Sequence, residues 1–238
     1  ARATGFIEWS EKGDKSEAQG FNARLANEAI NFGWSHSPIL LNRDDIPYPS
    51  VKVGWGNTNL DFDLRAFQWV GNVRGPLGST TEPLFNRIHG ALASGKYNSE
   101  SWGVAMLFGS AKEVSQDTSN IDNISAISIS GFTLFDNIRL LWEVSKSSTA
   151  EEGFSWQLGG EYTQDNIKIG VNHYVTQADL YGGNGYTEWS NAGIPLGIMT
   201  GGNSKSSVIY VEYRNILLPK WIILSEVGTL KSTQYDYD

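Results

Sequence analysis

Strict alternation of apolar and polar residues over 154–164 and 167–177 limits the fold of this chain more than any other feature of its sequence. A period of two is the pattern of a β-strand with one apolar and one polar face. Asp165-Asn166 separates the two runs and is a tight-turn pair, so the stretch predicts a β-hairpin. Its apolar face meets either a second sheet, as in a soluble β-sandwich, or lipid, as in a membrane β-barrel.

The same alternation recurs along the chain, and helical periodicity is nearly absent. It predicts an all-β chain of about twelve strands. The expected strands are 4–10, 21–33, 50–55, 60–69, 84–95, 101–110, 122–135, 138–147, 153–164, 167–177, 206–214 and 221–232.

Short and long connections alternate between these strands. Residues 136–137 and 165–166 are very short connections, whereas 70–83, 111–121 and 178–205 are long. Outer-membrane barrels have short periplasmic turns and longer outer loops. The pattern therefore favours an antiparallel, up-and-down transmembrane β-barrel, with a soluble β-sandwich of the same alternation as the alternative.

Composition excludes several classes of protein. The 238 residues carry a formal net charge of −8, which argues against a nucleic-acid partner. The chain has no cysteine, so it has no disulfide, thiolate metal site or cysteine nucleophile. No run of about 18 apolar residues is present, which excludes a membrane-spanning helix but not a barrel, whose strands alternate.

In a barrel, the two faces of each strand have different surroundings. We expect Leu158 and Ile169 to face lipid, so that Leu158→Arg impairs membrane assembly, whereas Gln157→Arg in the lumen is tolerated. The polar register also supplies the candidates for the lumen lining, which are Asp61, Asp63, Arg65, Arg139, Glu143, Gln157, Glu161 and Lys168.

No catalytic or metal site stands out. His36, His89 and His173 have no metal-like spacing, no G-x-S-x-G elbow is present, and nothing singles out an acid and a nucleophile among the glutamates. We expect no metal, no cofactor and no enzymatic activity.

Aromatic side chains beside polar groups in the long connections are a better lead. Trp and Tyr rings stack on the apolar faces of sugars, while Asn and Asp hydrogen-bond their hydroxyl groups. The glycan-binding candidates are Trp34, Asp44, Asp45, Tyr48, Tyr181, Tyr186, Trp189 and Asn191. The alternative is that these connections plug the barrel with their own aromatic residues.

Two stretches are similar to a known family. Residues 32–55 (FGWSHSPILLNRDDIPYPSVKVGW) contain Trp34, Ser37, Leu40, Leu41, Asn42, Pro47 and Pro49 in an order that resembles the Wzi-type capsule surface-assembly proteins of bacterial outer membranes. The family's W-G-P-G turn is replaced here by Gly33-Trp34-Ser35-His36. Residues 193–213 resemble the family's late G-[RK]-P-L-G-H-x-x-G-x-D-S element, with Ile194, Ile198 and Asn203 at its basic, His and Asp positions.

The resemblance implies a large, occluded outer-membrane barrel that binds or organises capsular or exported polysaccharide without catalysis. Its partners would be outer-membrane lipid and polysaccharide. We therefore expect residues 1–238 to form one outer-membrane barrel domain, and hypothesise that it is an internal portion of a longer barrel. A substrate-selective sugar porin is the main alternative, and a soluble glycan-binding protein or hydrolase is the third.

Overall fold

The computed structural model describes most of the chain. The described residues are 6–10, 20–35, 38–74, 84–114, 123–150, 153–178, 180–181, 190–191, 194–195, 197, 203–214 and 222–232. Within these ranges every regular element is a β-strand, and the strands run antiparallel to their neighbours. No helix in the described part of the chain has the length and apolarity needed to cross a membrane.

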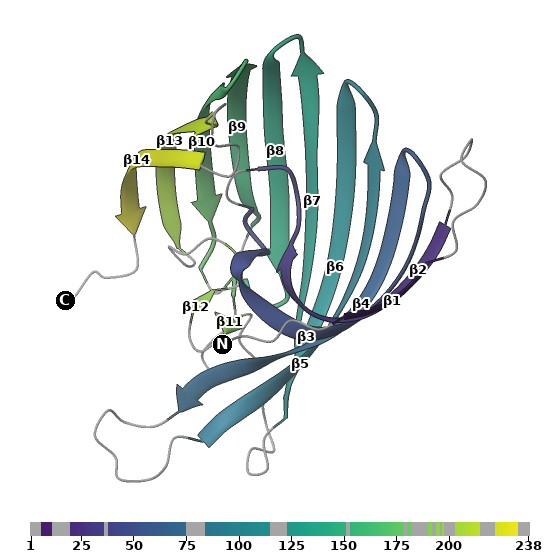
Figure 1. Ribbon diagram of the computed structural model, residues 1–238. Helices are drawn as coiled ribbons and strands as arrows, with labels where there is room; N and C mark the ends of the chain where they lie inside the picture. The colour runs from purple at the N-terminus through teal and green to yellow at the C-terminus, as the bar shows by residue number, and fades with distance from the viewer. Residues whose placement is uncertain are drawn as a thin grey trace, which may run out of the picture.

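Twelve strands form one curved sheet (Figure 1). They are β1 (Phe6–Ser10), β2 (Gly20–Asn31), β3 (Asn42–Gly56), β4 (Leu60–Arg74), β5 (Leu84–Asn98), β6 (Trp102–Val114), β7 (Ile124–Phe135), β8 (Ile138–Ser147), β9 (Ser155–Gln164), β10 (Ile167–Thr176), β13 (Ser204–Arg214) and β14 (Ile222–Ser232). The short strands β11 (Ser190–Asn191) and β12 (Ile194–Pro195) pair with each other in a separate small sheet.

The strand order is that of an up-and-down meander. Each strand pairs with its neighbours in sequence, and β10 pairs with β13 once the small sheet is passed. The all-β, antiparallel, up-and-down prediction is therefore confirmed. Among the described residues no ladder joins β1 to β14, and Figure 1 shows these two edges at opposite sides of the curved sheet.

Between β3 and β10 the connections are sorted by length, as predicted. The turns 57–59, 99–101, 136–137 and 165–166 lie at one end of the central strands, which we call the short-turn end. Asp136 and Asp165 open two-residue turns with φ of 49° and 50°, the left-handed conformation that such hairpin turns require. The connections after β2, β4, β6, β8 and β10 lie at the other end and are longer.

Strand boundaries differ from the prediction on the β3–β4 hairpin. β3 begins at Asn42, not at residue 50, and β4 continues to Arg74, so the connection expected at 70–83 is shortened. Pro47 and Pro49 lie within this strand. A proline in a strand removes only one donor, and the backbone pairing of β2 with β3 continues past Pro49 with an irregularity between Glu28 and Ile30.

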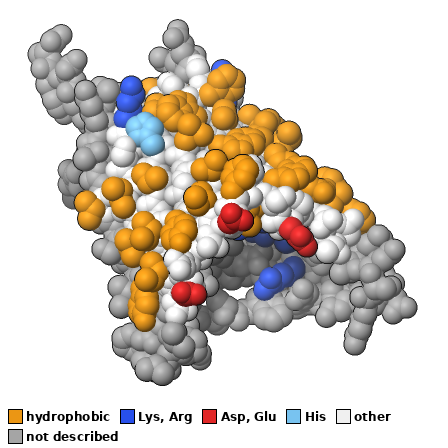
Figure 2. Space-filling view, turned by 90° about the horizontal axis from the view of Figure 1, so that it is seen from above, with side chains coloured by type: hydrophobic (Ala, Val, Ile, Leu, Met, Phe, Trp, Pro, Cys, Tyr) orange, Lys and Arg blue, Asp and Glu red, His pale blue; other side chains and the backbone are white. Residues whose placement is uncertain are grey.

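Large apolar side chains cover the outer, convex face of the sheet. Cross-strand neighbours continue the apolar register from strand to strand, as where Leu158 lies beside Trp142 and His173. Exposed members along the sheet include Leu25, Val53, Phe62, Phe108, Ile127, Leu140, Leu158, Ile169, Ile209 and Val227. Figure 2, seen from the short-turn end, shows hydrophobic side chains gathered on the outside of the curved wall.

The hydrophobic core lies inside the curve. Residues 32–35 and 38–41, which we call the plug segment, belong to the connection between β2 and β3 and pack against the inner face. The amide N of Phe32 donates a hydrogen bond to the carbonyl O of Leu41 at 3.1 Å and closes the base of this segment. The core comprises Phe32, Ile39, Leu40, Leu41, Phe67, Ile88, Leu92, Ala105, Leu107, Ala111, Ile124, Ala126, Tyr174, Leu180 and Tyr181. The expectation of a polar inner face therefore holds only outside this core.

Candidate functional site

A carboxylate on the inner face of β8 holds the plug segment. Alternation along β8 directs Glu143 inward, and its side chain is completely buried. The amide N of Ile39 donates to Oε2 of Glu143 at 2.9 Å, and the amide N of Leu40 approaches Oε1 at 3.4 Å. A buried carboxylate must have its oxygens satisfied, and here the backbone of the plug segment supplies the donors.

Side chains from three strands complete the shell of Glu143. Ser128 Oγ of β7 donates to Oε1 at 2.7 Å, and Ser145 Oγ of β8 donates to the same oxygen at 3.1 Å. The amide Nε2 of Gln157 on β9 donates to Oε2. Charge-assisted hydrogen bonds are about twice as strong as neutral ones, so this carboxylate is a firm attachment point for the plug segment.

The hydrogen-bond network continues from Gln157 back into the plug segment. Ser35 Oγ donates to Oε1 of Gln157 at 2.8 Å, and Asn172 Nδ2 donates to the same oxygen at 2.7 Å. Gln157 is buried, with 1% of its surface exposed. We therefore expect Gln157→Arg to be destabilising, unlike the expectation from the sequence, because it would bury a larger charged side chain within this network.

The other side of Ile39 is held by the connection between β10 and β13. The hydroxyl of Tyr181 donates to the carbonyl O of Ile39 at 2.5 Å. Gly197 packs so closely on this peptide that a Cβ at its position would lie 1.6 Å from the same carbonyl O. Ile39 is therefore fixed from the sheet side by Glu143 and from the loop side by Tyr181 and Gly197.

A row of cations and rings lies on the inner face beside the plug segment. Lys96 Nζ is 4.8 Å from the centroid of the Trp34 ring, Trp34 meets Phe132 edge to face at 5.1 Å, and Arg139 Cζ is 4.8 Å over the Phe132 ring. Cation–ring contacts of this kind orient the charged groups and stabilise them modestly. The plug segment, β5 and the β7–β8 hairpin thus place two cations on one surface.

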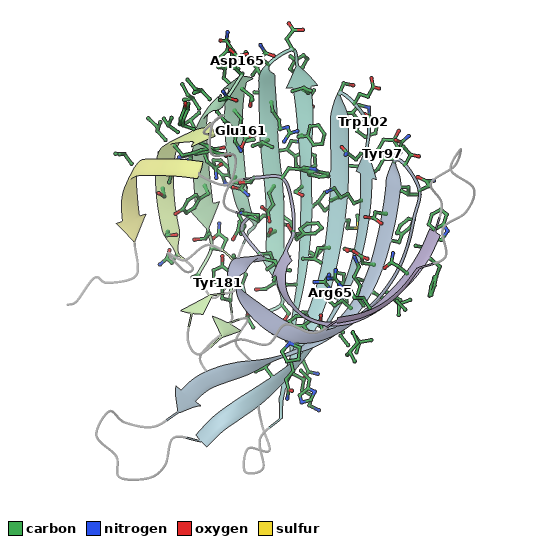
Figure 3. All side chains as sticks on the ribbon, in the orientation of Figure 1. Arg65, Tyr97, Trp102, Glu161, Asp165 and Tyr181 are labelled. Carbon is green, nitrogen blue, oxygen red and sulfur yellow. The ribbon has the colours of Figure 1, made fainter. Side chains whose placement is uncertain are left out.

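Arg139 also lines a polar pocket at the short-turn end. The pocket has a volume of about 360 Å³. Its lining residues are Leu134, Asp136, Asn137, Arg139, Glu161, Thr163, Asp165, Asn166, Ile167, Lys168 and Glu212. Figure 3 shows Glu161 toward this end, near the turn of Asp165, and Tyr181 toward the opposite end of the sheet.

Ion pairs inside this pocket involve Lys168, Glu161 and Glu212. Lys168 Nζ lies 2.9 Å from Oε2 of Glu212 and 3.9 Å from Oε1 of Glu161. The hydroxyl of Tyr210 donates to the same oxygen of Glu161 at 2.5 Å. Tyr210 covers Gly170, where a Cβ would come within 2.2 Å of its ring, so the glycine makes room for the tyrosine to reach Glu161.

The structure places all eight predicted lining residues in the inner-facing register. Glu143, Gln157 and Glu161 are buried, whereas Asp61 is exposed. Asp63 Oδ1 pairs with Lys52 Nζ at 2.8 Å, away from the pocket. The set is therefore divided between the attachment of the plug segment, the polar pocket and the wall formed by β3 and β4, and does not line one continuous path.

The glycan-binding candidates are less well grouped. Tyr181 is buried in the core and Trp34 is half-buried, so these two aromatic residues help to fill the barrel-like curve, as the alternative interpretation anticipated. The backbone of Asp44, Asp45 and Tyr48 belongs to β3 and not to a loop, and their side chains lie outside the described residues. Tyr186 and Trp189 also lie outside them, as does the side chain of Asn191, whose backbone is in β11.

Several residues of the site were missed by reasoning from the sequence. Ser128 and Ser145 have inward register positions beside Glu143, and Ser130 lies directly across from it on β7. Three small polar residues around one acid were an available signal. Tyr210 and Glu212 alternate inward on β13 opposite Gly170 and Lys168. No local pattern pointed to Ile39, because only its backbone takes part.

Comparisons with known proteins give no family assignment. Neither the models of known protein families nor the curated proteins contain a match to this chain.

Proposed function

We propose that this protein is a non-enzymatic outer-membrane protein that binds or organises capsular or exported polysaccharide at the cell surface. The observation that carries the proposal is the attachment of the plug segment to the inner face of a sheet whose outer face is apolar and suited to contact with lipid. Glu143 accepts hydrogen bonds from the backbone of this segment, which buries Ile39, Leu40 and Leu41 inside the curve. A sheet whose inner side is filled in this way is better suited to anchoring a polysaccharide than to letting solutes diffuse through.

The outer face supports placement in a membrane. Leu158 is 59% exposed and Leu64 is 63% exposed, and their cross-strand neighbours include Trp142 for Leu158 and Val53 and Ala93 for Leu64. A soluble β-sandwich would cover such a face with a second sheet, but none among the described residues does so. Extended apolar patches of this kind belong to interfaces with lipid or protein.

The filled interior weighs against the sugar-porin alternative. A porin needs a continuous polar path along its inner face. Here residues from five different strands form an apolar core with the plug segment, across the half of the sheet nearest the long connections. The buried polar residues near the long connections, such as Ser147, Thr176 and Ser204, hydrogen-bond to other side chains of the protein, and a separate polar pocket lies at the short-turn end.

The polysaccharide part of the proposal rests on the Wzi-type resemblance. Residues 32–55 and 193–213 carry that resemblance, and they are far apart in sequence. In the structure they meet, because Gly197 packs on the carbonyl O of Ile39. Two similar motifs that form one contact are stronger support than two motifs with separate places in the fold.

Two measurements on the detergent-purified protein and on producing cells test the proposal. In planar bilayers we expect membrane insertion, shown by heat-modifiable gel mobility, without stable conductance. Cells that lack the protein should retain less surface polysaccharide than cells that produce it. Stable channels blocked by sugars would favour the porin, and solubility without detergent would overturn the membrane placement.

A further inference from the structure

We infer that the polar pocket at the short-turn end binds a carboxylate-bearing sugar, a hexuronate residue of a glycan, with Arg139 as its anchor. The inference goes beyond the proposed function, because it concerns a separate site that neither the glycan-binding candidates nor the plug segment forms. It depends on the pocket alone and not on where the protein resides.

Arg139 is the cation of the pocket that pairs with no described carboxylate, whereas Lys168 pairs with Glu212 and Glu161. Among the described residues, the guanidinium has no ion-pair or hydrogen-bond partner, and it lies over the Phe132 ring. The cross-strand neighbour Glu161 directs its carboxylate to Tyr210 and Lys168 instead. A half-buried guanidinium with five free N–H donors is preorganised for an incoming acceptor.

The geometry of the guanidinium favours a carboxylate. The planar fork of an arginine binds two carboxylate oxygens at once, which gives both energy and orientation. The Phe132 ring covers one face of Arg139 and so limits its rotation. The loss of conformational entropy when a long side chain becomes ordered normally opposes binding. The Arg139 side chain is already ordered in the free protein, so this loss is smaller on binding.

The rest of the pocket suits hydroxyl groups. Thr163, Asn137 and Asn166 offer hydroxyl and amide groups, and Asp136 and Asp165 on the two turns offer acceptors. One unpaired cation surrounded by acceptors matches a ligand with a single carboxylate and several hydroxyls. The same acidic rim disfavours a compact, doubly charged anion such as phosphate.

The size and shape of the pocket agree with a sugar residue. A volume of about 360 Å³ is at the lower end of the range of small-molecule sites. Figure 2 shows that the curved sheet is hollowed when seen from this end, where the residues that line the pocket lie. A glycan could therefore reach the pocket from the short-turn end without displacing the plug segment.

Binding of a galacturonate trisaccharide to the full chain in detergent, measured by isothermal titration calorimetry, tests the inference. Arg139→Gln should weaken binding about tenfold or more, since loss of a charged hydrogen-bonding partner costs at least that factor. Lys146→Gln is the matched control, because Lys146 also lies over a ring, that of Phe154, but on the outer face. This control should bind as the parent does.

A second variant keeps the test independent of the stability of Arg139→Gln. Thr163→Trp places a large side chain in the pocket at an exposed position, so it should abolish binding while heat-modifiable gel mobility is unchanged. A neutral glucose trisaccharide and inorganic phosphate are the comparison ligands, and both should bind at least tenfold more weakly.

Three results would overturn the inference. They are equal binding of the neutral trisaccharide, equal binding of phosphate, and undiminished binding by Arg139→Gln or Thr163→Trp. Failure of the proposed function would be seen in different measurements. A protein that conducts, or that is soluble without detergent, could still bind the uronate. A membrane-inserted protein without conductance could fail to bind it.

Discussion

The backbone amide of Ile39 donates a hydrogen bond to Oε2 of Glu143 at 2.9 Å, across 104 residues of sequence. Through this contact, the apolar run between two strands is held inside the curved sheet and fills part of it. The carbonyl O of the same residue accepts from Tyr181, so one peptide connects the wall, the plug segment and the β10–β13 connection.

Removal of the Glu143 carboxylate should release the plug segment. Glu143→Ala leaves the Ile39 amide, the Ser128 hydroxyl and the Gln157 amide without their acceptor inside the protein. We expect a loss of about 3 kcal/mol or more in the free energy of unfolding, measured by urea titration in detergent. We also expect conductance in planar bilayers where the parent is silent.

The matched control for this prediction is Asp61→Ala. Asp61 shares the inner-facing register but is exposed. The Asp61→Ala variant should have a stability and a conductance close to those of the parent protein. An equally stable Glu143→Ala that remains electrically silent would show that the carboxylate does not hold the plug segment.

The Tyr181 hydroxyl should contribute a smaller, coupled amount. Tyr181→Phe removes the hydrogen bond to the Ile39 carbonyl and keeps the packed ring, so we expect a loss of about 1 kcal/mol in unfolding free energy. Combined with Glu143→Ala, the two effects should be less than additive, because both act on one peptide. If the two losses of unfolding free energy simply added in the double-mutant cycle, the two contacts would act independently and the prediction would be wrong.

Arginine on the outer face should be costly in a way that depends on depth. Leu158 lies in the middle of β9, and Tyr162 lies near its short-turn end, both exposed on the same face. In lipid vesicles Leu158→Arg should cost about 2–4 kcal/mol of folding free energy, and Tyr162→Arg about 0–1 kcal/mol. Equal tolerance of both changes would contradict contact with lipid.

Gly197 should not accept even a methyl group. In Gly197→Ala the new Cβ would collide with the Ile39 carbonyl O, which both Tyr181 and the packed backbone hold in place. We expect a lower temperature for the loss of the folded band in heat-modifiable gel mobility, with a cost of roughly 1–3 kcal/mol.

Gly160 provides the control glycine. A Cβ at Gly160 would meet only Leu140 at an ordinary 3.8 Å on the outer face, so Gly160→Ala should behave like the parent. If Gly197→Ala were as stable as Gly160→Ala, the backbones of Gly197 and Ile39 would not approach each other as closely as described.

The inner half of the fold could be predicted only in part. Inward positions of Glu143, Glu161 and Lys168 follow from alternation, but alternation does not say whether a polar side chain meets water, an ion pair or a buried backbone amide. Glu143 became an attachment point because the plug segment descends onto it, whereas Lys168 became part of an ion-paired pocket. Their local sequence patterns are alike.

The sequence by itself determined the strands, their two faces and the alternation of short and long connections, because these features follow from a period of two and from local turn chemistry. Only the tertiary structure decided where residues 32–35 and 38–41 go, which part of the inner face is apolar, and that Arg139 has no ion-pair partner among the described residues. Those outcomes depend on hydrogen bonds and packing between residues that are distant in the chain, as with Ile39 and Glu143. No local pattern contains such contacts, since they exist only once the sheet has curved.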